Sequence, residues 1–348
     1  MLLHYSAVAG LCFCCCISPA KRGFFVGKMK VQNIIDVIGD TPLIRLNNLN
    51  RDVHAQIFVK AEFLNPGGSM KDRMAYSMVQ DAEEKGLLKK GGTIVEPTSG
   101  NTGAGLAMIA AVKGYSFIAV MTEKTSIEKE LVLKAYGASV VRTPVNVDHD
   151  HPDYYVNVAK RIAKEKNAFM PDQYNNQANP RAYYLSTGPE IWNDTDGKIT
   201  HFVATMGTGG SITGTAHYLK ERNPEIKVIG VDPAGSLLHH FYYHTSGKLK
   251  PYLVEGPGKE HMSDALDMDS IDEVIVVNDK DAFTTARMLV KKEGIFAGGS
   301  SGMAVFAALQ LAKRLTKNDT IVILLPDSGR SYLSKLYNDD WMSEHNML

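Results

Sequence analysis

Short apolar runs rich in β-branched residues alternate with helical patterns along most of the chain, and glycines mark many of the junctions. The runs predict strands at 93–96, 117–121, 138–141, 201–205, 227–231, 273–277 and 320–325. Helical spacing predicts helices at 104–112, 126–136, 211–222, 279–292 and 301–314, with residues 100–103 as a loop. Alternation of this kind is typical of an α/β fold with mostly parallel sheets flanked by helices.

Two segments interrupt the pattern. Residues 149–181 are polar and carry Pro152, Pro171 and Pro180, so we expect this segment to return the chain between two lobes. Residues 235–264 form the longest stretch without periodicity, and a loop of that length is usually functional or mobile. Two lobes are expected because 348 residues exceed the size at which one core usually keeps growing.

Composition narrows the class of partner. The 38 Lys and Arg residues balance the 38 Asp and Glu residues, which gives no reason to expect a nucleic-acid or anionic-membrane partner. All four cysteines, at positions 12, 14, 15 and 16, precede the predicted fold. The rest of the chain therefore has no disulfide or thiolate metal site, no metal is expected, and a reducing compartment such as the cytoplasm is favoured.

The first residues are treated as a separate leader, 1–29. An apolar stretch at 5–20 precedes Lys21 and Arg22 but is too short for a convincing membrane-spanning helix. Three interpretations remain: a disordered leader before a working start at Met29, a targeting signal, or a palmitoylated tether that uses the cysteines. Targeting by residues 1–28 is therefore left open.

A glycine-rich loop predicts a phosphate site. The segment GTGGS at 207–211 follows a predicted strand and opens a predicted helix, where backbone N–H groups and the helix dipole can converge on a dianion. Thr208 and Ser211 add hydroxyl donors. A tight structural turn is the plainer alternative, whereas a dinucleotide fingerprint fails because Ile212 stands where its last glycine belongs.

Lys71 is the candidate reactive amine. It lies in NPGGSMKDR (65–73), where two glycines and a serine bring it to a helix start. The positive end of the helix dipole disfavours its protonated form, which suits an amine that binds an aldehyde as a Schiff base. A lone lysine in this position is usually a solvated charge, so the prediction depends on the accompanying phosphate loop.

Two further loops complete the set. TSGNTG at 98–103 also opens a helix and predicts a second anion site, sized for a substrate carboxylate, with a structural turn as the alternative. GGSSG at 298–302 presents Ser300, which is either a helix cap or a hydroxyl for a ring nitrogen. An amine, a phosphate cradle, a carboxylate cradle and such a hydroxyl together predict pyridoxal phosphate.

In order and spacing, these loops resemble the fold-type II pyridoxal-phosphate enzymes of the tryptophan-synthase β-subunit type, over about residues 31–341. The motifs most resemble the cystathionine β-synthase catalytic core: NPGGSMKDR, EKTSIEK (123–129), GVDP (230–233), EGIFAGGS (293–300) and LPDSGR (325–330). STGPEIW (186–192) is more similar to O-acetylserine sulfhydrylase, a cysteine synthase.

The resemblance implies a two-lobed fold with a smaller domain at 65–178 and a larger one formed by 30–64 and 179–348. It implies a homodimer, and no haem is expected because the leader lacks a Cys-Pro-x-His pair. It assigns the cofactor to Lys71, to Asn101 at the ring hydroxyl, to Ser300 at the ring nitrogen and to Gly207, Thr208, Gly209, Gly210 and Ser211 at the phosphate. The substrate carboxylate is assigned to Thr98, Ser99, Thr102 and Gln173.

The implied reaction is β-replacement on serine or an activated serine. Homocysteine as acceptor gives cystathionine and sulfide gives cysteine; serine or threonine dehydration and a non-catalytic sensor are further alternatives. The segment expected to close over the second substrate is EGPGKE (255–260), and it carries Lys259 where the similar β-synthases commonly have tyrosine and the sulfhydrylases a small residue. Lys259 is accordingly predicted to contact the acceptor, or to be a solvated lysine on a mobile loop.

Overall fold

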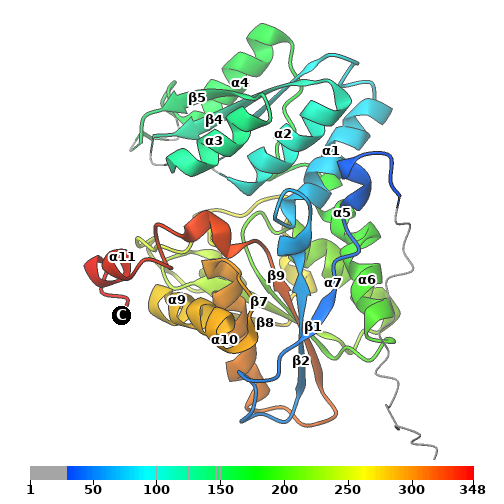
Figure 1. Cartoon of the computed structure of the whole chain (residues 1–348), viewed down its shortest axis with the longest axis vertical. Coiled ribbons are helices and arrows are strands. Elements are labelled where there is room, and N and C mark those ends of the chain that lie inside the picture. The colour runs from blue at the N-terminus through cyan, green and yellow to red at the C-terminus, as the bar shows by residue number, and fades with distance from the viewer. Residues whose placement is uncertain (1–29, 99, 124, 146, 149) are drawn as a thin grey trace, which may run out of the picture. The chain divides into compact units, whose positions relative to one another are not determined.

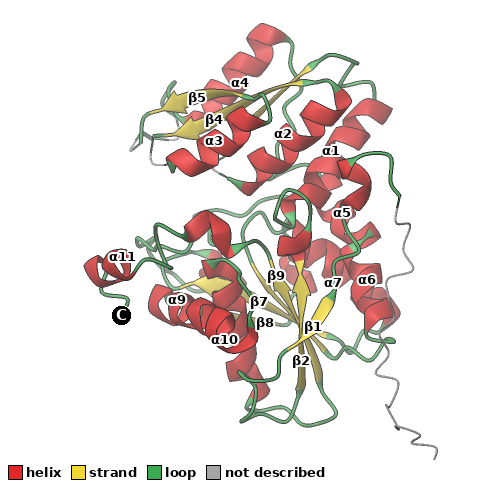
Figure 2. Cartoon of the chain, in the orientation of Figure 1, coloured by secondary structure: helices red, strands yellow, loops and turns green. Residues whose placement is uncertain are grey.

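The computed structural model describes residues 30–348, apart from 99, 124, 146 and 149. It contains two β-sheets with helices on both faces of each (Figures 1 and 2), which confirms the α/β prediction. The leader and its cysteines lie outside the described residues. Within the described part of the chain, no helix is both long and apolar enough to cross a bilayer.

The larger sheet has six strands in the order β1-β2-β9-β6-β7-β8. β1 pairs antiparallel with β2 at one edge, and all other pairs are parallel. In chain order, the strands are β1 (Leu43–Arg45), β2 (Gln56–Ala61), β6 (His201–Thr205), β7 (Lys227–Pro233), β8 (Glu273–Val277) and β9 (Thr320–Leu325).

Alternate residues of the central strand β9 build two cores. Ile321, Ile323 and Leu325 pack in the cluster that includes α9 (Asp279–Met288) and α10 (Gly299–Ala312). Val322 and Leu324 pack in the opposite cluster. The second cluster includes residues of α5 (Ala178–Leu185) and α7 (Gly210–Arg222). Because β9 is covered on both faces, its sequence is a continuous apolar run.

The smaller sheet is parallel, in the order β3-β4-β5. Its strands are β3 (Thr93–Pro97), β4 (Ser116–Thr122) and β5 (Ser139–Thr143). Figure 1 shows α1 (Lys71–Glu84), α2 (Asn101–Lys113) and α3 (Ile127–Ala135) over one face, with α4 (Tyr155–Lys166) over the other. The prediction for 149–181 did not include α4, although Val158, Ala159 and Ile162 show helical spacing.

Other boundaries differ modestly from the predictions. α2 begins at Asn101, so the predicted loop 100–103 is shorter than expected, and α9 ends in a single π turn, Leu289–Glu293. Residues 235–264 are mostly loop around the short α8 (Leu238–Tyr242), as expected. The remaining helices are α6 (Thr187–Asp194) and α11 (Asp339–Glu344). The domain boundaries at 65 and 178 stay predictions.

Candidate active site

A cavity of about 350 Å³ lies where the carboxyl ends of β3, β6 and β9 meet the starts of α1, α2, α7 and α10. The carboxyl ends of parallel strands are the usual position for ligand sites in α/β folds. Eleven of the predicted site residues line the cavity: Lys71, Thr98, Asn101, Thr102, Gln173, Gly207, Thr208, Gly209, Ser211, Lys259 and Ser300. Gly210 belongs to the same loop without lining the cavity, and Ser99 lies outside the described residues.

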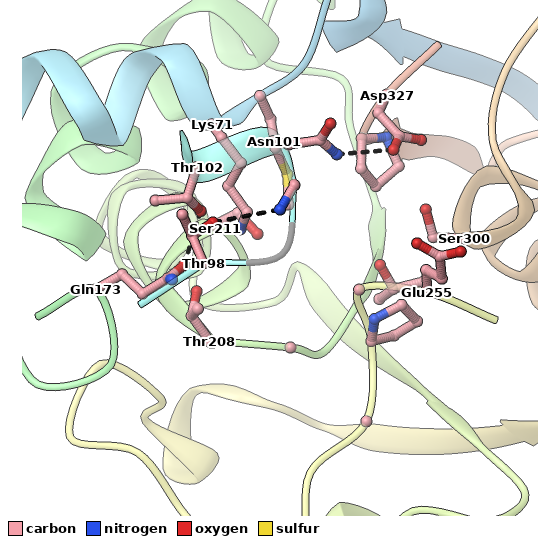
Figure 3. Close-up of a pocket in the computed structure, with 18 of the residues that line it drawn as sticks. Lys71, Thr98, Asn101, Thr102, Gln173, Thr208, Ser211, Glu255, Ser300 and Asp327 are labelled. Atoms are coloured by element: carbon pink, nitrogen blue, oxygen red, sulfur yellow. Dashed lines mark hydrogen bonds between the residues drawn. The ribbon is translucent and has the colours of Figure 1, made fainter. Parts of the chain in front are cut away.

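Lys71 is the first residue of α1, and its backbone N–H donates to Ser69 Oγ at 3.2 Å. Burial of the ammonium group, with a smaller contribution from the charge of Lys259, lowers the Lys71 pKa to about 8. Figure 3 shows Lys71, Thr98, Thr102 and Gln173 on one side of the cavity, with Ser300, Glu255 and Asp327 on the other. A lysine with a lowered pKa is an effective nucleophile near neutral pH.

Buried charges fix the start of α1. The Arg73 guanidinium donates to Glu62 at 2.7 and 2.8 Å and to Glu190 at 2.6 and 2.8 Å. The neighbouring Asp72 accepts the Gly67 N–H at 2.6 Å, and a Cβ on Gly67 would lie 2.4 Å from the other Asp72 oxygen. The glycine before Lys71 is therefore required by close packing, and α1 is held on both sides of the lysine.

The loop at 207–210 tolerates only glycine at three positions. A Cβ on Gly207 would lie 2.5 Å from the Gly256 carbonyl, one on Gly209 2.3 Å from Leu266 Cβ, and one on Gly210 2.0 Å from Asn179 Oδ1. Gly209 also has φ +89°, in the region that favours glycine. This loop opens α7, so its geometry fits an anion bound at a helix N-terminus.

The loop that opens α2 is built around two threonines. Thr98 Oγ1 accepts from the N–H groups of Gly100 and Gly103 at 3.3 and 3.2 Å. Thr102 Oγ1 donates to Gln173 Oε1 at 2.8 Å, which joins two residues that are far apart in the sequence but share one predicted role. These contacts gather polar groups at one end of the cavity.

Glu96 holds the backbone beside Gln173 and so positions the polar end of the cavity, a role that the sequence did not predict. It is fully buried at the end of β3 and accepts the backbone N–H groups of Asp172 and Gln173 at 3.0 and 3.2 Å. Burial raises its pKa to about 8. Its sequence signal is an acidic residue inside an apolar strand, directly before a glycine-rich loop.

Asp327 orients Asn101 and was also missed. Asn101 Nδ2 donates to Asp327 Oδ2 at 2.8 Å, and the Tyr332 hydroxyl donates to the same oxygen at 2.6 Å. The other oxygen, Oδ1, is buried without a hydrogen-bond partner among the described residues, and burial raises the Asp327 pKa. Asp327 lies within the motif LPDSGR, so the motif signalled the region without revealing this contact.

Ser300 lies in the first turn of α10 with 5% of its surface exposed. Within the described part of the chain its hydroxyl makes no hydrogen bond, although it faces the cavity. A buried hydroxyl normally has a partner, so Ser300 is available to a polar atom of a ligand.

Glu255 and Lys129 are two further charged residues that line the cavity, and neither was predicted as a site residue. Glu255 accepts from Lys129 of α3 and from Lys335, and these two cations lower its pKa. Lys129 also lies 5.6 Å from the centre of the Tyr332 ring. The pair joins a helix on the smaller sheet to the segment that closes one side of the cavity.

Comparison with known proteins identifies relatives. A family model described as "Pyridoxal-phosphate dependent enzyme" matches residues 34–327. Cystathionine beta-synthase of Apis mellifera is 48% identical over 91% of this chain, and the matched region is 64% of that protein's length. A probable cysteine synthase of Bacillus subtilis is 46% identical over 87% of this chain and 96% of its own.

Two solved enzyme structures are also similar to this chain along nearly their whole length. O-ureido-L-serine synthase superposes with a TM-score of 0.83 and 36% identity, covering 90% of this chain and 99% of that one. A hydrogen sulfide-producing enzyme from Fusobacterium nucleatum superposes with a TM-score of 0.81 and 39% identity, covering 87% of this chain and 100% of that one.

Proposed function

The chain belongs to the family of pyridoxal-phosphate dependent enzymes, and we propose that it catalyses β-replacement on serine or an activated serine, with homocysteine as acceptor. One observation carries the proposal: four loops far apart in the sequence converge on a single cavity around a lysine with a lowered pKa. The cystathionine β-synthase relatives support serine and homocysteine as the substrates.

The cavity fits the family's cofactor. The backbone of the 207–210 loop, which packs closely against Gly256, Leu266 and Asn179, opens a helix and with the hydroxyls of Thr208 and Ser211 suits the phosphate. The Ser300 hydroxyl, which makes no hydrogen bond to any residue that the structure describes, suits the ring nitrogen, and Asn101, held by Asp327, suits the ring hydroxyl. When bound, pyridoxal phosphate supplies an electron-withdrawing ring that stabilises negative charge at the substrate α-carbon.

The chain's own residues bind and orient the substrate. Lys71 accepts the proton from the substrate α-carbon, a task that its pKa of about 8 supports because part of the amine is uncharged near neutral pH. Thr98, Thr102 and Gln173, with Ser99, receive the α-carboxylate. Glu96 holds the Gln173 backbone and so keeps this group in place.

The overall change balances without an added oxidant or reductant. The bond between the serine β-carbon and its oxygen breaks, and the hydroxyl leaves as water with the proton of the acceptor thiol. A carbon–sulfur bond forms at the same β-carbon, so serine and homocysteine give cystathionine and water. With O-acetylserine the leaving group is acetate.

Cysteine synthesis from sulfide is the second candidate, and one observation favours it. The Bacillus subtilis probable cysteine synthase matches this chain over 96% of its own length, whereas the chain spans 64% of the Apis mellifera relative. At 46% identity the probable cysteine synthase is nearly as similar to this chain as the 48% identical cystathionine beta-synthase, so sulfide stays a candidate acceptor beside homocysteine. The two candidate reactions differ in the acceptor, homocysteine or sulfide, and in the leaving group, hydroxyl or acetate.

A steady-state comparison tests the proposal. Serine and O-acetylserine are each combined with homocysteine and with sulfide, and products are quantified by mass spectrometry. The highest kcat/KM is expected for serine with homocysteine. A higher value for O-acetylserine with sulfide would establish the cysteine synthase alternative, and no β-replacement in any combination would refute the proposed function.

The proposal also covers the oligomeric state of the protein and the cell compartment in which it works. We propose a homodimer, as expected for the family, and its mass in solution is the direct test. The absence of cysteine after residue 16 supports a reducing compartment such as the cytoplasm.

A further inference from the structure

Lys259 is a cation that lines the cavity and contacts an aromatic residue. Its Nζ donates to the Tyr174 hydroxyl at 2.8 Å and lies 4.1 Å from the centre of the Tyr174 ring. Among the residues that the structure describes, no carboxylate forms an ion pair with Lys259, whereas the nearby Lys129 is paired with Glu255. Burial lowers the Lys259 pKa to about 8 although the charge of Glu260 acts in the opposite direction, so the Lys259 charge is costly where it lies.

The backbone around Lys259 is fixed, which argues against a solvated lysine on a mobile loop. Its N–H donates to Ser236 Oγ at 2.9 Å, and its carbonyl accepts from Leu237 N–H at 2.9 Å and from the Ser236 hydroxyl at 3.1 Å. The preceding Gly258 N–H donates to the Met206 carbonyl at 2.7 Å. The side chain is therefore presented to the cavity from an anchored segment.

The position of Tyr174 indicates which end of the cavity Lys259 serves. Tyr174 directly follows Gln173, whose amide oxygen accepts from Thr102. Lys259 thus extends the polar group assigned to the substrate carboxylate. Burial raises the Tyr174 pKa, so its phenol stays neutral and gives Lys259 no counter-charge; the carboxylate that acts on Lys259 is that of its neighbour Glu260.

We infer that Lys259 and Tyr174 form a receptor for a negatively charged group of the acceptor substrate, which makes Lys259 a specificity residue for thiols that carry a carboxylate. This inference rests on the proposed β-replacement function and adds the class of acceptor. An anion beside Lys259 would form a direct ion pair with it, and a buried charge is tolerated when it is paired. The other anions proposed for the cavity are the cofactor phosphate and the α-carboxylate of serine; both stay the same when the acceptor is changed, so a comparison of acceptors separates them from the acceptor carboxylate.

The test compares two acceptors that differ only in the carboxylate: homocysteine and 3-aminopropane-1-thiol. Lys259→Met removes the charge at similar length, and Lys259→Arg restores it. Lys250→Met is the matched control, since Lys250 is an exposed lysine in the same 235–264 segment. For Lys259→Met, the ratio of the homocysteine KM to the aminothiol KM should rise about fivefold, with recovery in Lys259→Arg and no change in Lys250→Met.

Each other outcome has a definite meaning. An unchanged KM ratio in Lys259→Met overturns the inference even if product still forms. A weaker dissociation constant for pyridoxal phosphate with an unchanged KM ratio assigns the cation to the cofactor phosphate instead. If the wild-type protein converts neither thiol, the proposed function itself is wrong, and the inference fails with it.

Discussion

Lys71 and Lys259 face one cavity, and the charge of Lys259 disfavours that of Lys71. For Lys71, burial is the largest cause of its lowered pKa, Lys259 lowers it further, and Asp327 acts in the opposite direction. An aldehyde reacts with the uncharged amine, so this arrangement prepares Lys71 for covalent attachment of the cofactor.

The pH dependence of attachment follows from these charges. With cofactor-free protein, the rate at which pyridoxal phosphate becomes linked to Lys71 should rise with pH and level off above about 8. Below that pH the amine is protonated and cannot attack. Lys259→Met removes a like charge, which raises the Lys71 pKa and moves the midpoint to higher pH.

Absorbance after rapid mixing, followed from about pH 6 to about pH 10, measures this rate. A midpoint that is unchanged, or that moves to lower pH in Lys259→Met, would contradict the electrostatic account of Lys71.

Ser300→Asp tests the ring-nitrogen assignment. A hydroxyl can donate to an unprotonated ring nitrogen, whereas an aspartate favours a protonated one. Turnover should fall about 100-fold, the scale of losing one well-placed electrostatic contact. Affinity for the cofactor should change little because the phosphate loop is intact. Wild-type kcat in this variant would remove Ser300 from the proposed site.

Some site residues could be predicted from sequence because their local motifs require their type. Gly207, Gly209 and Gly210 are examples, since each lacks space for a Cβ. Asp327 and Glu96 carry no such signal, because their roles depend on burial and on distant partners. Asp327 contacts Asn101 across 226 sequence positions, a pairing that no spacing rule predicts.

At the scale of elements, the phosphate loop depends on the conformation of Gly209. Gly209→Ala should weaken binding of pyridoxal phosphate at least about tenfold, because the new Cβ would meet Leu266 and φ +89° strains alanine by about 1–2 kcal/mol.

Gly114→Ala is the matched control for that loop. Gly114 also has positive φ, +75°, at the end of α2, but its Cβ would meet open space. Both variants should lose thermal stability, and titration calorimetry should show weaker cofactor binding in Gly209→Ala alone. Equal affinities would mean that the loop accommodates a side chain and is not the phosphate cradle.

Helix α1 depends on buried charge. Glu62→Gln should lower the free energy of unfolding by about 3 kcal/mol, because Arg73 and Glu62 have 2% and 0% of their side chains exposed. Asp81→Asn is the control: the Lys85–Asp81 pair has the same 2.7 Å separation, but 62% of Lys85 is exposed, so the loss should stay below about 1 kcal/mol. Urea titration measures both, and equal losses would show that burial does not set the strength of the pair.

Strands and helices with simple periodicity were predicted well, whereas the residues at which helices begin and end were predicted less well. β6 and β9 have the predicted limits, 201–205 and 320–325, because each is built on a compact apolar run, 202–204 and 321–325. α2 begins at Asn101 because a helix can start within a glycine-rich loop once its first turn packs against neighbours. α4 was missed because its apolar positions lie among lysines in a segment marked by prolines.

At the scale of the whole molecule, the parallel arrangement of strands brings the site together. The cavity takes its residues from the carboxyl ends of β3 in the smaller sheet and of β6 and β9 in the larger one. The order of the four loops predicted the family, which the matching family model confirms. Their meeting in one cavity required the fold, because sequence order does not give the order of strands in a sheet.

Reduction with borohydride tests the central claim most directly. The protein loaded with pyridoxal phosphate is reduced, digested and mapped by mass spectrometry to find the lysine that carries the cofactor. The account predicts the label on Lys71, and its loss in Lys71→Ala without appearance elsewhere. A label on Lys259, whose pKa is also about 8, or on any other lysine in the wild-type protein would contradict it.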